Sequence, residues 1–359
     1  MIHWTQAPQA IAFAALIGDK MARRPMEIPT PMNRLDRRLC VAPMMDWTDR
    51  HCRYLHRLYA PHALLYTEMI VAKAIVRGDV RQLLDHDAAE YPVALQLGGC
   101  DPKELAQAAR IGAKAGYAEI NLNVGCPSDR VKNGSFGACL MLKPALVADC
   151  VASLRDASRL PVTVKCRIGI DDRDDYEFFH AFVDSVARAG IDALIVHARA
   201  AILAGLSPKQ NREIPLLKYD YVHRLKGERP ELAVVLNGGV SDAAQVLGHL
   251  RAGLDGVMLG RAAYHRPALL AELEQSLLDP AWAVPEPWQI VERVIPYAKR
   301  CAQRGIRLHS ITRHMHGVMA GREGARAWRR FLSEVAARPE AAPEALFSAL
   351  PILNQGIAA

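Results

Sequence analysis

The stretch at residues 118–142 reads AEINLNVGCPSDRVKNGSFGACLML, and it is the best guide to the fold. Its first part alternates apolar and polar residues as far as Asn123, which is typical of a strand. The strand must end at Gly125-Cys126-Pro127, because proline has no N–H for a neighbouring strand and glycine permits unusual backbone angles. A thiol is therefore expected at the C-terminal end of a strand, where an α/β barrel keeps its functional residues.

Cys126 also has a structural interpretation, because free cysteines are often small buried hydrophobes. Asn123, three residues earlier, and the glycine-containing loop that follows favour a functional role instead. We expect the nearby Cys139 to be structural. The chain has eight cysteines but no CxxC pair and no Cys/His cluster at zinc spacing, so neither a metal site nor a disulfide framework is predicted.

Seven further segments have the pattern of buried strands, each a short apolar run followed by a helical pattern. They are 38–45, 64–67, 93–97, 161–167, 193–197, 233–239 and 256–261. Continuous apolar runs indicate strands that are covered on both faces, as in a parallel sheet. Eight such units predict a (β/α)8 TIM barrel over 35–280. An open doubly wound sheet is disfavoured, because no glycine-rich turn follows the first strand.

Helical patterns separate these strands. The predicted helices cover 48–58 with Thr48 as N-cap, 71–84, 102–116, 144–158, 175–189, 219–226, 242–250 and a final stretch up to 278. A proline-rich hinge at 280–287 then precedes a purely helical pattern. We therefore predict a small all-helical C-terminal domain at 287–359, with residues 1–34 as a disordered N-terminal extension.

The composition is that of a soluble globular protein, since 51% of residues are hydrophobic and 23% are charged. No apolar run reaches the roughly 18 residues that a membrane span needs. Residues 7–17 lack the basic start and the cleavage site of a signal peptide. Together with unpaired cysteines, these features predict a cytoplasmic protein.

The net charge is +7, and basic residues concentrate near the C-terminus. Four arginines fall within nine residues, namely Arg322, Arg326, Arg329 and Arg330. A clustered surplus on one helical segment favours a polyanionic partner such as nucleic acid. An ordinary solvated helix face is the alternative.

Polar residues and glycines stand at the ends of the predicted strands, and in a barrel these ends converge on one mouth. They are Pro43, Met44, Met45, Gln96, Asn121, Asn123, Cys126, Lys165, Arg167, His197, Asn237, Gly238, Gly239, Gly260 and Arg261. Taken singly, Lys165 could be a barrel residue with a solvated tip and His197 a core histidine. Together they favour a ligand site.

The last two strand ends indicate the kind of ligand. Asn237-Gly238-Gly239 and Gly260-Arg261 expose backbone N–H groups without side chains in the way, which suits a phosphate. With Lys165 and Gln96 across the mouth, we expect a phosphorylated planar cofactor, and FMN fits well. A hydride donor facing Cys126 implies reduction of a polarised C=C bond, with the thiol as general acid.

Several motifs resemble those of tRNA-dihydrouridine synthases over about residues 35–335. They are VAPM at 41–44, DWTD at 46–49, NLNVGCP at 121–127, RIGIDD at 167–172, NREIP at 211–215, ITRHM at 311–315 and ARAWRR at 325–330. The resemblance implies an FMN enzyme that uses NADPH to reduce the C5–C6 bond of uridine at positions 20 and 20a of tRNA. Cys126 would protonate C5 while hydride from FMN reaches C6.

The same resemblance implies a role for each site residue. FMN would be held by Pro43, Met44, Met45, Gln96, Lys165, His197, Asn237, Gly238, Gly239, Gly260 and Arg261. The tRNA would contact Asn123, Lys209, Arg212, Arg326 and Arg329. NADPH rests on the resemblance alone, because the sequence has no dinucleotide fingerprint. One barrel with an RNA-gripping domain is expected to act as a monomer.

Two other functions stay open at this point. A small-molecule FMN oxidoreductase of the dihydroorotate dehydrogenase kind would share the barrel, the phosphate site and the thiol. However, a free pyrimidine needs no basic C-terminal segment. An RNA-binding barrel without a cofactor would not need Cys126, Lys165 and His197 together.

Overall fold

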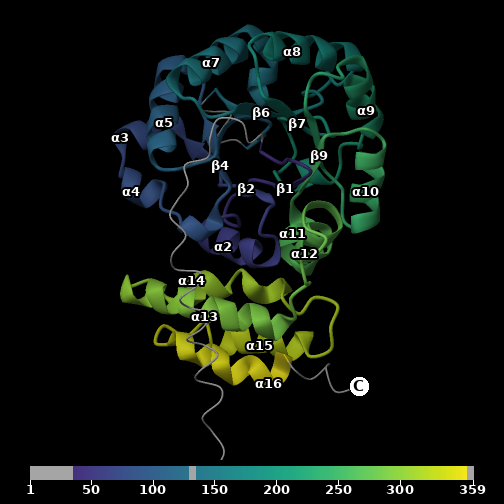
Figure 1. The fold of residues 1–359 in the computed structure, drawn as a ribbon. Coiled ribbons are helices and arrows are strands. Elements are labelled where there is room, and N and C mark those ends of the chain that lie inside the picture. The colour runs from purple at the N-terminus through teal and green to yellow at the C-terminus, as the bar shows by residue number, and fades with distance from the viewer. Residues whose placement is uncertain (1–34, 129–134, 354–359) are drawn as a thin grey trace, which may run out of the picture. The chain divides into compact units, whose positions relative to one another are not determined.

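The computed structural model describes residues 35–128 and 135–353, so the predicted extension at 1–34 lies outside the described residues. Eight parallel strands form the barrel (Figure 1): β1 (Leu39–Val41), β2 (Leu64–Tyr66), β4 (Val93–Gly98), β5 (Glu119–Val124), β6 (Val162–Arg167), β7 (Ala193–His197), β8 (Val234–Asn237) and β9 (Gly256–Leu259). β9 pairs with β1, and β2 pairs with β4, so the sheet closes on itself. The predicted (β/α)8 barrel is confirmed.

Helices follow the strands and cover the outside of the barrel (Figure 1). They are α2 (Arg50–Tyr59), α3 (Ala72–Arg77), α4 (Val80–Leu83), α5 (Pro102–Lys114), α7 (Pro144–Ala157), α8 (Tyr176–Arg188), α9 (Tyr219–Glu228), α10 (Ala243–Arg251), α11 (Arg261–His265) and α12 (Ala268–Leu273). Gly112 shows how closely α5 lies on the sheet, because a Cβ there would come within 2.5 Å of Leu95. The apolar strand faces are thus buried under helices.

β5 differs from an ordinary half-exposed strand, because its polar residues lie in the barrel interior and not in solvent. Its apolar residues Ile120, Leu122 and Val124 belong to the core between strands and helices. Its polar residues Glu119, Asn121 and Asn123 alternate with them and bond to side chains of other strands inside the barrel. The alternation that predicted a strand therefore places polar groups in the barrel interior.

Two helix predictions near the N-terminus are wrong in detail. The expected helix at 71–84 is divided into a short strand β3 (Ile70–Val71), α3 and α4, because Asp79 caps a new helix by accepting from the N–H groups of Arg81 and Gln82. Asp49, not Thr48, is the N-cap of α2. The Thr48 hydroxyl instead accepts from the N–H of Met44 at 2.8 Å.

The segment after β9 also differs from prediction. The strand expected at 256–261 ends at Leu259, and Arg261 already begins α11. The expected continuous helix up to 278 is interrupted between α11 and α12. Pro267 stands at the break, immediately before the first residue of α12. A π-helical turn, Glu274–Leu278, completes it.

The described residues after 287 are helical, as predicted. They form α13 (Pro287–Gln303), α14 (Leu308–Thr312), α15 (Ala325–Glu334) and α16 (Leu350–Leu353), with short 3-10 turns between them. From Asp36 onward the chain is one compact unit, and the domain division at 280–287 stays a prediction. None of the described helices combines the length and apolar character that a membrane span requires.

Asp49 joins the barrel to these helices. Its carboxylate accepts from Arg313 at 2.6 Å and from His314 Nε2 at 3.0 Å. Burial alone would raise the pKa of Asp49, but the hydrogen bonds and charge of His314 and Arg313 hold that pKa well below its usual range. Nearby, His51 Nδ1 lies 2.7 Å from the hydroxyl of Tyr297 on α13. Arg313 and His314 of the ITRHM motif therefore anchor the helical segment at the start of α2.

Candidate active site

Cys126 lies in the loop directly after β5, partly accessible. The side-chain Oδ1 of Asn123 accepts from the N–H of Cys126 at 3.0 Å and from the N–H of Gly125 at 3.2 Å. The carbonyl of Cys126 accepts from Ala138 N at 2.9 Å, and its Sγ lies 3.4 Å from Ser128 Oγ. These bonds hold the thiol at the end of the strand, where the sequence places it.

Asn123 and Gln96 are brought together beside Cys126. Asn123 Nδ2 donates to Gln96 Oε1 at 2.8 Å, and Gln96 Nε2 donates to Asn121 Oδ1 at 2.7 Å. All three amide side chains are buried. Each amide nitrogen has two hydrogens, so Asn123 and Gln96 each keep one N–H for a ligand.

Lys165 stands opposite Asn123 in the register of β5 and β6. Its ammonium group has no hydrogen-bond or ion-pair partner within the described ranges. Burial, and secondly the charge of Arg167, lowers the pKa of Lys165 to about 8. A cation held in this state is suited to an anionic or electron-accepting ligand.

His197 ends β7, and its Nδ1 atom is buried without a hydrogen-bond partner in the described structure. Burial, followed by the charges of Arg167 and Lys165, holds the pKa of His197 well below its usual range, so the ring is neutral. A buried polar atom without a partner is costly, which indicates that a ligand bonds to it.

Arg167 was not among the predicted binding residues, yet it organises the mouth. Its guanidinium is buried and donates to the carbonyl oxygens of Gly125 at 2.9 Å, Ala200 at 2.8 Å and Asn211 at 3.0 Å. It thereby joins the Cys126 loop to the loop after β7. Its place in the RIGIDD motif was the available signal, but its acceptors are backbone atoms from distant segments.

Gly238 and Gly239 follow β8 with φ angles of +107° and +75°, which favour glycine. A Cβ on Gly239 would come within 2.5 Å of Leu217, and one on Gly238 would approach the His197 ring at 3.2 Å. The Asn237 side chain donates to the carbonyl of Met258 at 2.8 Å. These residues form a close turn beside His197.

The other predicted cofactor residues border this turn. Gly260 follows β9, and a Cβ on it would stand 3.6 Å from Met44 Sδ. Pro43 and Met44 are partly accessible after β1, whereas Met45 is 53% exposed on the rim. Arg261 forms an ion pair with Glu213 at 2.6 Å, so its charge is already partly neutralised.

Apart from Asn123 on β5, the predicted RNA contacts lie on two separate elements. Lys209 and Arg212 are exposed on the loop after β7, which includes the 3-10 turn Gln210–Arg212. The charge of Arg212 lowers the pKa of His197, which places it near the mouth. Arg326 and Arg329 are exposed on α15, whose buried face consists of Trp328, Phe331 and Leu332. The structure does not cluster these two arginines with Cys126.

Asn211 was missed by the sequence analysis as a separate site residue, although it stands in the NREIP motif. It is fully buried, and its side chain bonds to both the N–H and the carbonyl of Ile202 at 2.8 and 2.9 Å and to the carbonyl of Leu206 at 3.2 Å. It fixes the loop that carries Lys209 and Arg212.

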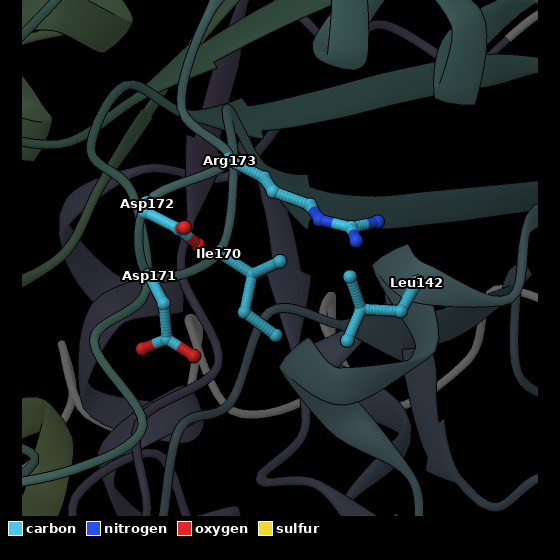
Figure 2. Close-up of a pocket in the computed structure, with 5 residues that line it drawn as sticks. All are labelled: Leu142, Ile170, Asp171, Asp172 and Arg173. Carbon is cyan, nitrogen blue, oxygen red and sulfur yellow. The ribbon is translucent and has the colours of Figure 1, made fainter.

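A separate pocket lies beside the loop after β6. It is lined by Leu142, Ile170, Asp171, Asp172 and Arg173, and Figure 2 shows the Arg173 side chain extending toward Leu142. Asp171 N donates to the carbonyl of Ala201, which joins this loop to the one after β7. The pocket contains none of the predicted cofactor residues, and we assign it no role.

The fold and the mouth define a class, a parallel barrel with a thiol, a cation and a neutral imidazole around one opening. Comparison with known families narrows this class. Residues 40–351 match the family model described as "Dihydrouridine synthase (Dus)". The chain belongs to the dihydrouridine synthase family, which confirms the resemblance drawn from its motifs.

Curated relatives agree with this assignment. The tRNA-dihydrouridine(20/20a) synthase of Xanthomonas campestris pv. campestris is 55% identical over 318 residues, which cover 88% of this chain and 94% of that protein. The protein of the same name from Pasteurella multocida is 52% identical, with coverages of 87% and 95%. That from Synechocystis sp. is 52% identical, with coverages of 87% and 93%.

Proposed function

We propose that this chain reduces the C5–C6 double bond of uridine to dihydrouridine at positions 20 and 20a of tRNA, with FMN as bound cofactor and NADPH as reductant. The relatives carry this activity in their names. The observation that carries the proposal is the set of side chains at neighbouring strand ends: the Cys126 thiol, and Lys165 and His197, whose polar atoms have no partner among the described residues.

The residues present fit FMN. Within the described part of the chain, the buried Nδ1 atom of His197 and the ammonium group of Lys165 both lack a partner, and a phosphorylated ring cofactor would supply one to each. The turn at Gly238-Gly239, whose two glycines have positive φ angles, would receive the phosphate on its backbone N–H groups. When bound, FMN supplies two-electron reducing chemistry, as hydride, to the pyrimidine.

Cys126 is the proposed general acid. Its Sγ would donate a proton to C5 of the uracil ring, and the bonds from Asn123 to the Cys126 loop hold that sulfur in a constant place. Lys165 would hold positive charge against the cofactor, which favours negative charge there. The remaining N–H of Asn123 would orient the uracil beside the thiol.

The target uridine has to leave the tRNA stack to reach a barrel mouth. Lys209 and Arg212 would contact the backbone near the mouth, and Arg326 and Arg329 would contact it from α15. Contacts of this kind position the RNA and add affinity without reading its sequence. The small-molecule alternative needs none of these cations, and no specific observation favours it.

An anaerobic flavin experiment tests the proposal. The purified protein is loaded with FMN, its absorption spectrum is recorded, and NADPH is added until the flavin bands disappear. Unmodified tRNA or orotate is then added to separate samples. Return of the bands with tRNA alone supports the proposal, return with orotate alone supports the small-molecule function, and failure to bind FMN contradicts the cofactor assignment.

A further inference from the structure

A buried carboxylate lies deep in the barrel below the active site. Glu119 is fully buried, and Arg37 donates to its Oε2 from Nε at 3.0 Å and from a terminal nitrogen at 2.6 Å. Its Oε1 accepts from the hydroxyl of Tyr66 at 2.7 Å and from that of Thr163 at 2.6 Å. A glutamate is almost never buried this completely unless it is paired, as Glu119 is here with Arg37.

From Glu119 a chain of hydrogen bonds runs up the barrel to Cys126. Thr163 Oγ1 accepts from Asn121 Nδ2 at 2.8 Å, and Asn121 Oδ1 accepts from Gln96 Nε2 at 2.7 Å. Gln96 Oε1 accepts from Asn123 Nδ2 at 2.8 Å, and Asn123 Oδ1 accepts from the N–H of Cys126 at 3.0 Å. We name the four side chains between Glu119 and Cys126 the amide column: Thr163, Asn121, Gln96 and Asn123.

The two ends of the amide column allow only one direction for its hydrogen bonds. At the lower end a carboxylate can only accept, so Thr163 must donate to Glu119 and Asn121 must direct its nitrogen toward Thr163. At the upper end the backbone N–H of Cys126 can only donate, so Asn123 must direct its oxygen upward. Both requirements give the same orientation for Gln96 in the middle.

We propose that Glu119 is a positioning residue that, through Thr163 and Asn121, fixes the amide orientation of Gln96 and Asn123 and so prepares the cofactor edge and the Cys126 loop. Only the identity of the cofactor, FMN, rests on the proposed function. The orientation of the amide column does not depend on it. With this orientation, Gln96 would offer its remaining N–H as a donor and its oxygen as an acceptor to the pyrimidine edge of FMN. If the Gln96 amide were reversed, its N–H would face a hydrogen-bond donor of the cofactor and its oxygen would face an acceptor.

Thr163→Val tests the column, because valine has the shape of threonine but makes no hydrogen bond. Asn121 then loses its acceptor and Glu119 loses one donor, so the amides above are free to reverse. Thr163→Ser restores the hydroxyl. The matched control is Tyr66→Phe, which removes a hydrogen bond to the same Glu119 oxygen but no member of the column.

Two readouts are measured, and neither needs tRNA. The first is the FMN dissociation constant of the apoprotein, from quenching of flavin fluorescence. We expect Thr163→Val to raise it about tenfold, the equivalent of one lost hydrogen bond, with Thr163→Ser and Tyr66→Phe within about threefold of the native value. The second is the rate at which iodoacetamide alkylates Cys126 in the apoprotein, quantified on its peptide, and we expect Thr163→Val to increase it.

Melting temperatures of the same variants separate positioning from general stability. The proposal is overturned if Thr163→Val and Tyr66→Phe change FMN affinity and alkylation equally, in proportion to their melting temperatures. If Thr163→Val does not fold, Glu119→Gln takes its place. The amide of Gln at this position can donate to Thr163, which favours the reverse direction of the hydrogen bonds in the amide column. The same outcomes support or overturn the proposal. Absence of FMN binding by the native protein would instead contradict the proposed function, while the alkylation rates would still decide the column.

Discussion

The Nε atom of Arg167 donates to the carbonyl of Gly125 at 2.9 Å, one residue before Cys126. The same guanidinium satisfies carbonyls of Ala200 and Asn211. Among the described residues it has no carboxylate partner, and burial lowers its pKa to about 10. A buried cation among carbonyls thus sets the relative position of two loops that form the mouth.

Replacement of Arg167 by Met should therefore destabilise the apoprotein. Three buried carbonyls lose a charged donor, and relief of the buried charge offsets part of that loss, so we expect a decrease of about 2 kcal/mol in the free energy of unfolding. Urea unfolding measures it. Arg188→Met, at an exposed arginine that ends α8, is the control and should change stability by less than about 0.5 kcal/mol. Equal effects of the two would contradict the role of Arg167.

Cys126→Ala should separate cofactor binding from chemistry. The thiol makes no bond that holds FMN in this proposal, so the FMN dissociation constant should stay within about twofold. Loss of a general acid should lower dihydrouridine formation by about 100-fold or more. The control is Cys139→Ala, which should keep near-native turnover, because the Cys139 Sγ donates to the carbonyl of Phe136 at 3.0 Å and has no other hydrogen bond within the described ranges. Unchanged turnover in Cys126→Ala would remove the acid assignment.

The elements were largely predictable because apolar runs and proline or glycine boundaries are local signals. Errors arose where two local signals competed, as when Asp49 rather than the adjacent Thr48 capped α2. Residue types at the mouth were predictable too, since His197 is the last residue of β7 and Cys126 lies two residues after β5. The contacts inside the barrel were not predictable. Arg167 and Glu119 bond to groups that are far away in the sequence, and only the folded barrel brings these groups together.

Lys165 should make stability depend on pH in a particular direction. Burial lowers its pKa from 10.5 to about 8, so between these values the unfolded chain holds more protons than the folded one. Stability must then rise with pH across this window, by on the order of 2 kcal/mol from this group. The measurement is urea unfolding of the flavin-free protein at several pH values from 7 to 10. Lys165→Met lacks the titrating group. The difference in the free energy of unfolding between the two proteins at each pH therefore removes the contribution of all other titrating residues. A difference that stays constant with pH would show that the Lys165 pKa is ordinary.

Arg326 and Arg329 should act on tRNA affinity alone. Both are exposed on α15, and the face of that helix that carries the fold consists of Trp328, Phe331 and Leu332, so the double change to Ala should leave stability and NADPH oxidation by the flavin unaltered. If each arginine contacts one phosphate, the slope of log affinity against log salt should fall by about 1.5, since each lost contact removes roughly 0.7 to 0.9 from it. The matched control, Arg188→Ala with Arg251→Ala, removes two exposed charges from the ends of α8 and α10 and leaves α15 intact. Equal slopes for both double variants would mean that only net charge matters, whereas a change confined to Arg326 and Arg329 would place the RNA backbone on α15.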